Sequence, residues 1–149
     1  MKAIVQTKYG PPGSVLRLKE IEKPVAGQGE ILVRVRAASV HPDVWHVVTG
    51  RPYILRLMGA GLAGPKDKVP GTDLAGVVEQ VGPGVTRFKP GDRVFGEAQA
   101  KMQWLNGGSF AEYATVPEQC LAHKPPGVGF KEAASVPTSG YIAFHNLLL

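Results

Sequence analysis

The sequence predicts a mainly β, barrel-like domain with short helices and a helix at its C-terminal end. Three observations support this prediction. Glycine and proline are frequent, with 19 and 13 residues in a chain of 149, a composition that favours short strands joined by tight turns. Several short segments have the β-branched or alternating pattern of strands. From Phe130 onward the apolar residues follow a helical pattern instead.

Length and composition limit the classes of function. A chain of 149 residues can form one domain with its own hydrophobic core. The net charge of +5 is spread along the chain, whereas nucleic-acid binding normally needs a clustered basic patch, so we expect no nucleic-acid partner. No apolar run approaches the ~18 residues of a membrane span. The N-terminus also lacks an apolar signal segment, so the expected location is the cytoplasm, with no membrane partner.

The first half of the chain alternates strand patterns with glycine and proline. Strand-like runs cover residues 3–6, 15–21 and 31–40, and the last of these alternates most clearly between apolar and polar side chains. Residues 40–50 then have proline near their start and glycine at their end, which suits a short helix. Asp43 is expected to cap that helix.

Residues 51–68 interrupt this regular order with an apolar stretch, several glycines and a polar exit. Long irregular excursions in compact domains are often functional. The segment is therefore either a surface excursion packed on the barrel or a flap beside a pocket.

Strand patterns and turns continue in the second half. The stretch 69–95 is a β-branched run between tight turns, and its polar turn at 71–76 lies where a loop meets a sheet, a common place for chemistry. Further short strands are expected at 110–116 and 119–122. A helical pattern begins at 130–134. Because the sequence ends on apolar residues, the last helix either docks on the barrel or leads to a partner domain.

Three glycine-rich motifs occur at fixed spacing in the second half of the chain. Residues 71–76 read GTDLAG and are followed by Gly82 and Val85, residues 89–94 read KPGDRV, and residues 107–113 read GGSFAEY. These motifs resemble the medium-chain dehydrogenase/reductase superfamily, and the match covers essentially the whole chain. The resemblance implies a GroES-like β-barrel, which agrees with the pattern of strands.

The resemblance implies the zinc-independent, quinone oxidoreductase-like branch and no metal. Zinc members hold the catalytic zinc with a Cys after the third strand and with the His of a G-H-E motif. Those positions are His41 and Thr72 here, and Asp73 replaces the glutamate. Threonine is a poor zinc ligand, and a catalytic zinc site normally has three protein ligands. The structural zinc of the family needs four cysteines, whereas this chain has one.

The resemblance also assigns candidate site residues. In the zinc-independent branch, the polar residue of a Val-Asn-Pro motif lies near the nicotinamide and the substrate, and His41 occupies its position. Histidine keeps the hydrogen-bonding capacity and adds a group that titrates near neutral pH. His41 is the expected catalytic donor, and His41 with Pro42 is expected to lie beside the cofactor. Trp45 and Tyr53 would flank the substrate cleft.

The cofactor implied by the resemblance is NADP. Related enzymes often carry a cofactor-contacting threonine after the P-x-x-G of the last helix, where this chain has Ile142, so Thr138 is the nearest hydroxyl. The superfamily binds the cofactor on a Rossmann domain after the barrel. Residues 59–64 spell G-x-G-x-x-G, but no strand precedes them, so we interpret this match as chance. The Rossmann domain is expected to be absent from residues 1–149.

Structural explanations stand beside these functional ones. A lone loop histidine such as His41 is usually solvated, and aromatic residues such as Trp45 and Trp104 more often belong to a core. Asp73 could serve structure alone by binding backbone N–H groups in its turn.

Two functions follow. The first is the substrate-side domain, residues 1–149, of an NADPH-preferring reductase of quinones, enones or small aldehydes, in which hydride passes directly from cofactor to substrate. This first hypothesis expects a homo-oligomer and an inactive isolated domain. The alternative is a non-enzymatic module that binds a partner through residues 141–149 or 51–68.

Overall fold

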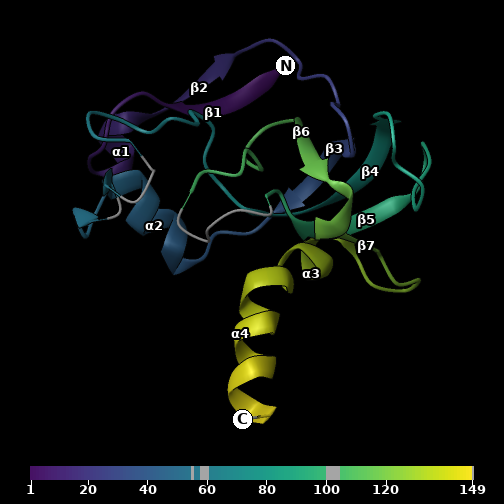
Figure 1. Ribbon diagram of the computed structural model, residues 1–149. Coiled ribbons are helices and arrows are strands. Elements are labelled where there is room, and N and C mark those ends of the chain that lie inside the picture. Colours follow the sequence, from purple (N-terminus) through teal and green to yellow (C-terminus); the bar gives the residue numbers. More distant parts are fainter. Residues whose placement is uncertain (55, 58–60, 100–104, 149) are drawn as a thin grey trace.

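The computed structural model describes residues 1–54, 56–57, 61–99 and 105–148, and it confirms a mainly β fold with a few short helices (Figure 1). Trp104 and part of the 51–68 segment lie outside the described residues. The described elements run in the order β1 (Lys2–Gln6), α1 (Pro12–Val15), β2 (Leu16–Glu20), β3 (Glu30–Ala38), α2 (Pro42–Thr49), β4 (Asp73–Val81), β5 (Arg93–Glu97), β6 (Tyr113–Pro117), the 3-10 helix η2 (Glu118–Cys120), β7 (Leu121–His123), α3 (Phe130–Ala134) and α4 (Pro137–Leu148).

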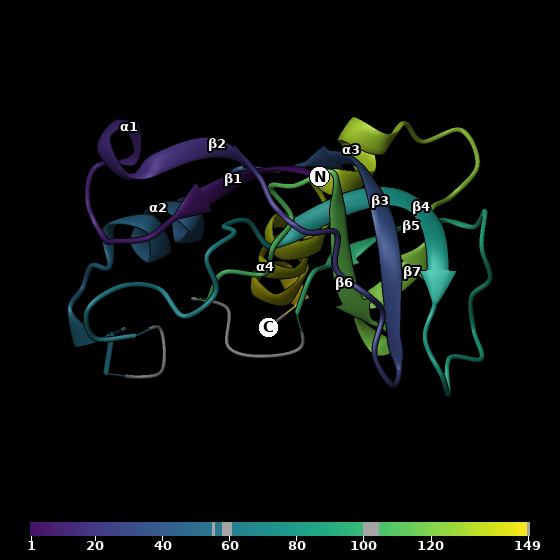
Figure 2. The ribbon, with the colours of Figure 1, turned by 90° about the horizontal axis from the view of Figure 1, so that it is seen from above.

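Five strands form one antiparallel sheet in the order β6-β3-β4-β5-β7, and β1 pairs with β2 in a separate ribbon. Figure 2 shows this ribbon beside α1 and α2, apart from the five-stranded sheet. The sequence predicted a barrel, whereas the strand pairings of the described residues form an open order that ends at β6 and β7. Register shifts between β3 and β4 bend the long central strands, because an extra residue on one strand kinks it.

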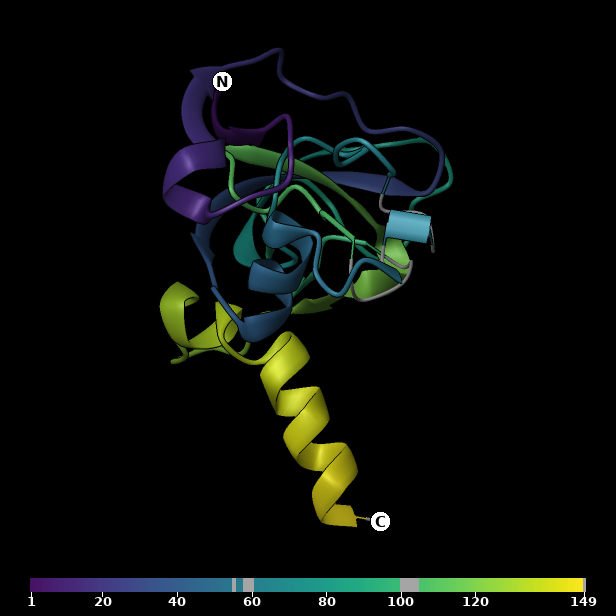
Figure 3. The ribbon, with the colours of Figure 1, turned by 90° about the vertical axis from the view of Figure 1, so that its left-hand side faces the viewer.

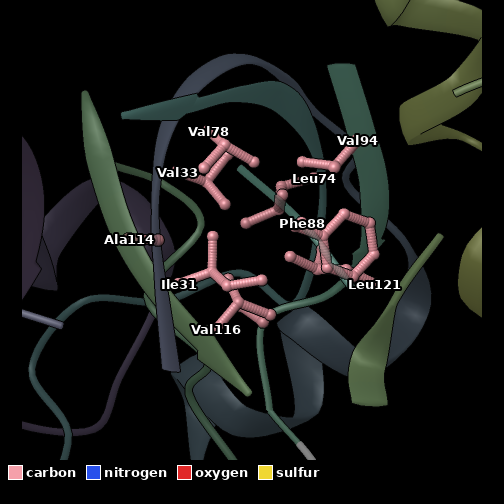
Figure 4. Packing of buried hydrophobic residues seen from close by; sticks show 10 residues of the cluster. Ile31, Val33, Leu74, Val78, Phe88, Val94, Ala114, Val116 and Leu121 are labelled. Atoms are coloured by element: carbon pink, nitrogen blue, oxygen red, sulfur yellow. The ribbon is translucent and has the colours of Figure 1, made fainter. Parts of the chain in front are cut away.

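The main core lies on the concave side of this sheet. Ile31 and Val33 on β3 point into this core, and Leu32 between them lies on the opposite face of the strand, where it is buried as well. Figure 4 shows side chains from several strands converging on one centre, together with Phe88 from the loop before β5. Nine labelled side chains share this centre: Ile31, Val33, Leu74, Val78, Phe88, Val94, Ala114, Val116 and Leu121. The apolar alternation in the sequence therefore identified the face of β3 that packs into this core, but it did not predict the burial of Leu32 on the other face.

Helix α2 confirms the prediction of a short helix after β3. Its N-cap residue is His41, proline occupies its first turn, and Gly50 ends it in the left-handed conformation with a φ of 63°. The prediction that Asp43 caps the helix is wrong. Asp43 lies inside the first turn, past the cap position, and the helix has no side-chain cap hydrogen bond.

Two other local predictions need correction. The segment 119–122 was expected to be a strand, but Glu118–Cys120 forms a 3-10 helix and pairing begins only at Leu121. The strand expected at 15–21 is shorter, because Pro12–Val15 first forms a helical turn. In both places a proline restricts the backbone just before the helical turn. The pattern of apolar residues, from which the strands were predicted, contains no information on this restriction.

Helix α4 projects away from the body of the molecule in Figures 1 and 3. Its first turn contacts β5, whereas Tyr141, Phe144 and Leu147 further along are exposed. Of the two alternatives for this helix, docking on the sheet therefore does not hold for these exposed residues. Among the described helices, none is long and apolar enough to cross a membrane.

Candidate functional site

His41 is buried at the start of α2, facing the start of β4. It is 8% exposed, and its Nε2 lies 2.6 Å from Oγ1 of Thr72. The Thr72 hydroxyl in turn lies 3.3 Å from Oδ1 of Asp73. A hydroxyl has one proton, so a Thr72 that donates to the carboxylate must accept from His41 Nε2–H. The hydrogen bonds therefore favour the tautomer with the proton on Nε2.

The other ring nitrogen of His41 is available for chemistry. Nδ1 is buried and has no hydrogen-bond partner among the described residues. The carboxylate of Asp43 lies 3.7 Å from it, beyond hydrogen-bond distance. Buried polar atoms in folded proteins are nearly always paired, so this unpaired ring nitrogen is an exception that calls for a functional explanation.

Asp73 is the centre of this polar network. It is 0% exposed and accepts hydrogen bonds from the hydroxyls of Thr72, Ser39 and Thr138. It also accepts the backbone N–H of Thr138 at 3.0 Å, in the first turn of α4. A buried carboxylate is tolerated when several donors surround it, and a helix N-terminus favours negative charge. Asp73 thus ties the start of β4 to the start of α4.

The sequence predicted that the Asp73 carboxylate binds backbone N–H groups within its own turn. In the structure, the backbone N–H that binds this carboxylate comes instead from Thr138, which is 65 positions away in the sequence.

Glu97 is a site residue that sequence analysis missed. It lies opposite Asp73 in the pairing of β4 with β5. Burial raises the pKa of the Glu97 carboxyl, and the nearby Asp73 carboxylate raises it further, while Thr138 and His41 oppose the shift. No motif marks Glu97 in the sequence, and only the strand register places it beside Asp73. The site therefore holds one histidine and two carboxyl groups that can keep or move a proton.

The donor set of this site does not match a zinc centre. His41 Nε2 and Asp73 Oδ1 are 3.9 Å apart, and the Thr72 hydroxyl binds the histidine nitrogen. Within the described part of the chain, no three His, Cys, Asp or Glu side chains are grouped so that they could hold a metal ion. Catalytic zinc sites use three protein ligands.

Trp45 and Tyr53 lie together in a separate place. They are 50% and 63% exposed, so the interpretation of Trp45 as a core residue does not hold. Both line a pocket of about 360 Å³ near the end of α2, with Tyr9, Arg51 and Arg56. His41 and Thr138 do not line this pocket.

The residues predicted from the sequence therefore fall into two groups. His41 and Thr138 converge on Asp73, and Trp45 and Tyr53 share the pocket. Pro42, the remaining predicted residue, is the first residue of α2 and follows His41 directly.

Comparison with known proteins finds one matching family model. The model of the alcohol dehydrogenase GroES-like domain matches residues 27–126. Among curated proteins, the chain is 32% identical over 145 residues to the chloroplastic quinone-oxidoreductase QR1 of Triphysaria versicolor. That match covers 96% of this chain and 40% of the relative.

Solved structures of similar proteins give the same result. The quinone oxidoreductase from Coxiella burnetii matches with a TM-score of 0.83 and 29% identity, over 99% of this chain and 44% of that one. A mycobacterial protein solved in complex with NADPH matches with a TM-score of 0.77 and 32% identity, over 99% of this chain and 39% of that one. The chain thus spans well under half the length of these relatives.

Proposed function

Because the chain belongs to the family of alcohol dehydrogenase GroES-like domains, we propose that it is the substrate-side domain of an NAD(P)H-dependent oxidoreductase. The proposed reaction is the reduction of a quinone, an enone or a small aldehyde by hydride transfer. The observation that carries the proposal is the buried chain of hydrogen bonds from His41 through Thr72 to Asp73. The similarity to quinone oxidoreductases supports the substrate class.

The proposed role of His41 is to stabilise and protonate the substrate oxygen. The cofactor supplies the hydride when it is bound, and negative charge then develops on that oxygen. A preorganised N–H donor in a site shielded from water lowers the barrier to this step. Nδ1 of His41 has no partner among the described residues, so protonated His41 can donate Nδ1–H to the oxygen.

Thr72 and Asp73 would hold the ring of His41 during this step. The Nε2–H bond to Thr72 fixes the ring orientation, and the Asp73 carboxylate lies 3.9 Å from the same nitrogen. The presence of Thr72 beside His41 supports zinc independence, because threonine is a poor zinc ligand and a catalytic zinc site uses three protein ligands.

NADP is the proposed cofactor, bound together with a Rossmann domain that follows this one. The NADPH complex of the mycobacterial relative supports this choice. On this chain, Pro42 and Thr138 remain the predicted cofactor contacts. The hydroxyl proton of Thr138 goes to Asp73 at 2.6 Å, so a contact through this hydroxyl would use its oxygen as an acceptor. A homo-oligomeric, cytoplasmic protein remains the expectation.

The test is an assay of the full-length protein with a panel of quinones and enones, each with NADPH and with NADH. We expect turnover with NADPH, no loss after treatment with a metal chelator, and no turnover by the isolated 149-residue chain. Absence of turnover across the panel would contradict the proposal, and loss of activity on chelation would contradict the zinc-independent mechanism.

One observation favours the alternative of a partner-binding module. Helix α4 exposes Tyr141, Phe144 and Leu147, a surface that another protein could cover. The same assay separates the two functions, because a binding module would show no turnover with either cofactor. We place the enzyme first because a module would not need a buried histidine held by Thr72.

A further inference from the structure

The pocket at the end of α2 has an unusual lining. Its walls carry the aromatic rings of Tyr9, Trp45 and Tyr53 and the side chains of Arg51 and Arg56. No aspartate or glutamate is among the described residues that line it. The pocket therefore combines flat apolar surfaces with two positive charges.

Arg56 is held in the pocket wall by one hydrogen bond and two aromatic rings. Its Nε donates a hydrogen bond to the carbonyl oxygen of Gly50 at 3.0 Å. Its guanidinium carbon lies 4.4 Å from the ring centre of Tyr9 and 4.8 Å from that of Tyr53. Stacking of this kind is attractive and orders the guanidinium before any ligand arrives.

Gly50 makes this arrangement possible. A Cβ atom at Gly50 would lie 2.6 Å from the Tyr9 ring and 2.7 Å from Nε of Arg56. The φ of Gly50 is +63°, which also favours glycine. The residue that ends α2 therefore lets the aromatic ring and the guanidinium pack directly against the backbone.

The neighbouring groups fix the rest of the wall. The Tyr9 hydroxyl donates to the carbonyl oxygen of Gly61 at 2.9 Å, and burial raises the pKa of Tyr9, so its phenol stays neutral. The ring of His46 lies 2.9 Å from the Arg51 carbonyl oxygen and ties that backbone to α2. The Arg51 side chain is exposed, and no ion pair neutralises Arg51 or Arg56 among the described residues.

We propose that this pocket binds a planar, conjugated compound that carries a carboxylate, with the ring against Trp45 and Tyr53 and the carboxylate on Arg51 and Arg56. Guanidinium groups bind carboxylates through strong, charge-assisted hydrogen bonds. Trp45 follows His41 by four residues, about one turn of α2. On the proposed function, on which this part of the inference rests, the preferred substrates are enones or quinones that bear an anionic group.

Binding to the 149-residue chain tests the pocket without any turnover. Cinnamate and its uncharged methyl ester differ mainly in charge, and the fluorescence of Trp45 reports their binding in a W104F background. We expect cinnamate to bind at least about tenfold more tightly than the ester, because its carboxylate contacts Arg51 and Arg56 together. The preference should shrink at high salt, because salt screens exposed charges.

Variants assign the charge preference to the two arginines. R51A should remove most of the preference, and R56Q should do the same. R36A is the control, since it loses the same charge at an exposed position outside this pocket and should keep the preference. Circular dichroism checks the fold of each variant, and R51A alters a side chain that makes no hydrogen bond among the described residues.

Equal binding of acid and ester, or a preference that survives R51A, would overturn the inference. Competitive displacement of cinnamate by NADPH would overturn the assignment to a substrate, because the pocket would then belong to the cofactor. The proposed function has its own separate test. An enzyme that reduces neutral quinones without any preference for charge would retain the function and lose this inference.

Discussion

The two ends of α2 carry opposite kinds of polar chemistry. At its start, His41 belongs to a closed network in which Thr72 and Thr138 direct their hydroxyls to one buried carboxylate. At its end, Arg51 and Arg56 border an open pocket that has no carboxylate among the described residues that line it. The closed network can hold a proton at a fixed atom, whereas the open pocket can select a ligand by charge. The short helix α2 thus separates the proposed proton donor, His41, from the pocket proposed to bind the charged group of the substrate.

The largest stability effect is expected at Asp73. D73N keeps the size of the side chain but removes the charge and turns one acceptor into a donor, which faces the donors of Thr138 or Ser39. We expect a loss of about 3 kcal/mol in the free energy of unfolding, since buried donors lose their acceptor. Urea unfolding at pH 7 measures this loss.

D43N is the matched control for the closed network. Asp43 is half-buried, and neither it nor the helix uses a side-chain cap hydrogen bond. The loss of stability in D43N should stay below about 1 kcal/mol, because no buried donor loses its acceptor. Equal losses for the two variants would mean that Asp73 is not the centre of the network.

A smaller effect is expected at Thr72. T72V keeps the shape of the side chain and leaves His41 Nε2 without its acceptor. The expected loss is about 1–2 kcal/mol, the usual result of leaving a buried polar atom unpaired. Nitrogen-15 NMR of the imidazole should also show loss of the preference for the Nε2–H tautomer.

T86V is the control for this substitution. Thr86 is exposed, and its hydrogen bond to Glu118 comes from the backbone. Both the stability and the His41 spectrum should stay unchanged. A wild-type spectrum with the proton on Nδ1 would contradict the hydrogen-bond assignment.

The smallest effect is a pH dependence at Glu97. Burial and Asp73 raise the pKa of Glu97 above its ordinary value of 4.5. A raised carboxyl pKa favours the folded state below the ordinary value, and that contribution is lost as pH rises through the folded pKa. Wild type should therefore lose stability relative to E97Q as the pH rises above 4.5. Parallel stability curves for the two proteins would show that Glu97 titrates as it does in the unfolded chain.

The sequence predicted regular elements better than long-range contacts. The alternation around Ile31 located β3, and the proline-to-glycine asymmetry ending at Gly50 located α2, because both signals are local. The capping role of Asp43 failed because the cap position depends on where the backbone turns, and His41 occupies it.

The site could be predicted only in part. The resemblance pointed to His41, but the bond from Asp73 to Thr138 depends on the approach of α4 to β4. The pairing register of β5 with β4 places Glu97 beside Asp73. Stacking on the Tyr9 ring places Arg56 in the wall of the pocket. These contacts join residues whose spacing in the sequence follows no short motif. Local sequence patterns were therefore enough to predict the helices and strands. The contacts that form the site depend on packing between distant segments, which these patterns do not show.

The most direct test of the account is the activity of H41A and H41N in the full-length protein with NADPH and a quinone. We expect H41A to lower kcat/KM by about 100-fold, the usual size of a lost proton donor. H41N should retain more activity, because asparagine keeps a hydrogen-bond donor. If H41A leaves kcat/KM unchanged while the protein remains folded, the assignment of His41 as the proton donor is wrong.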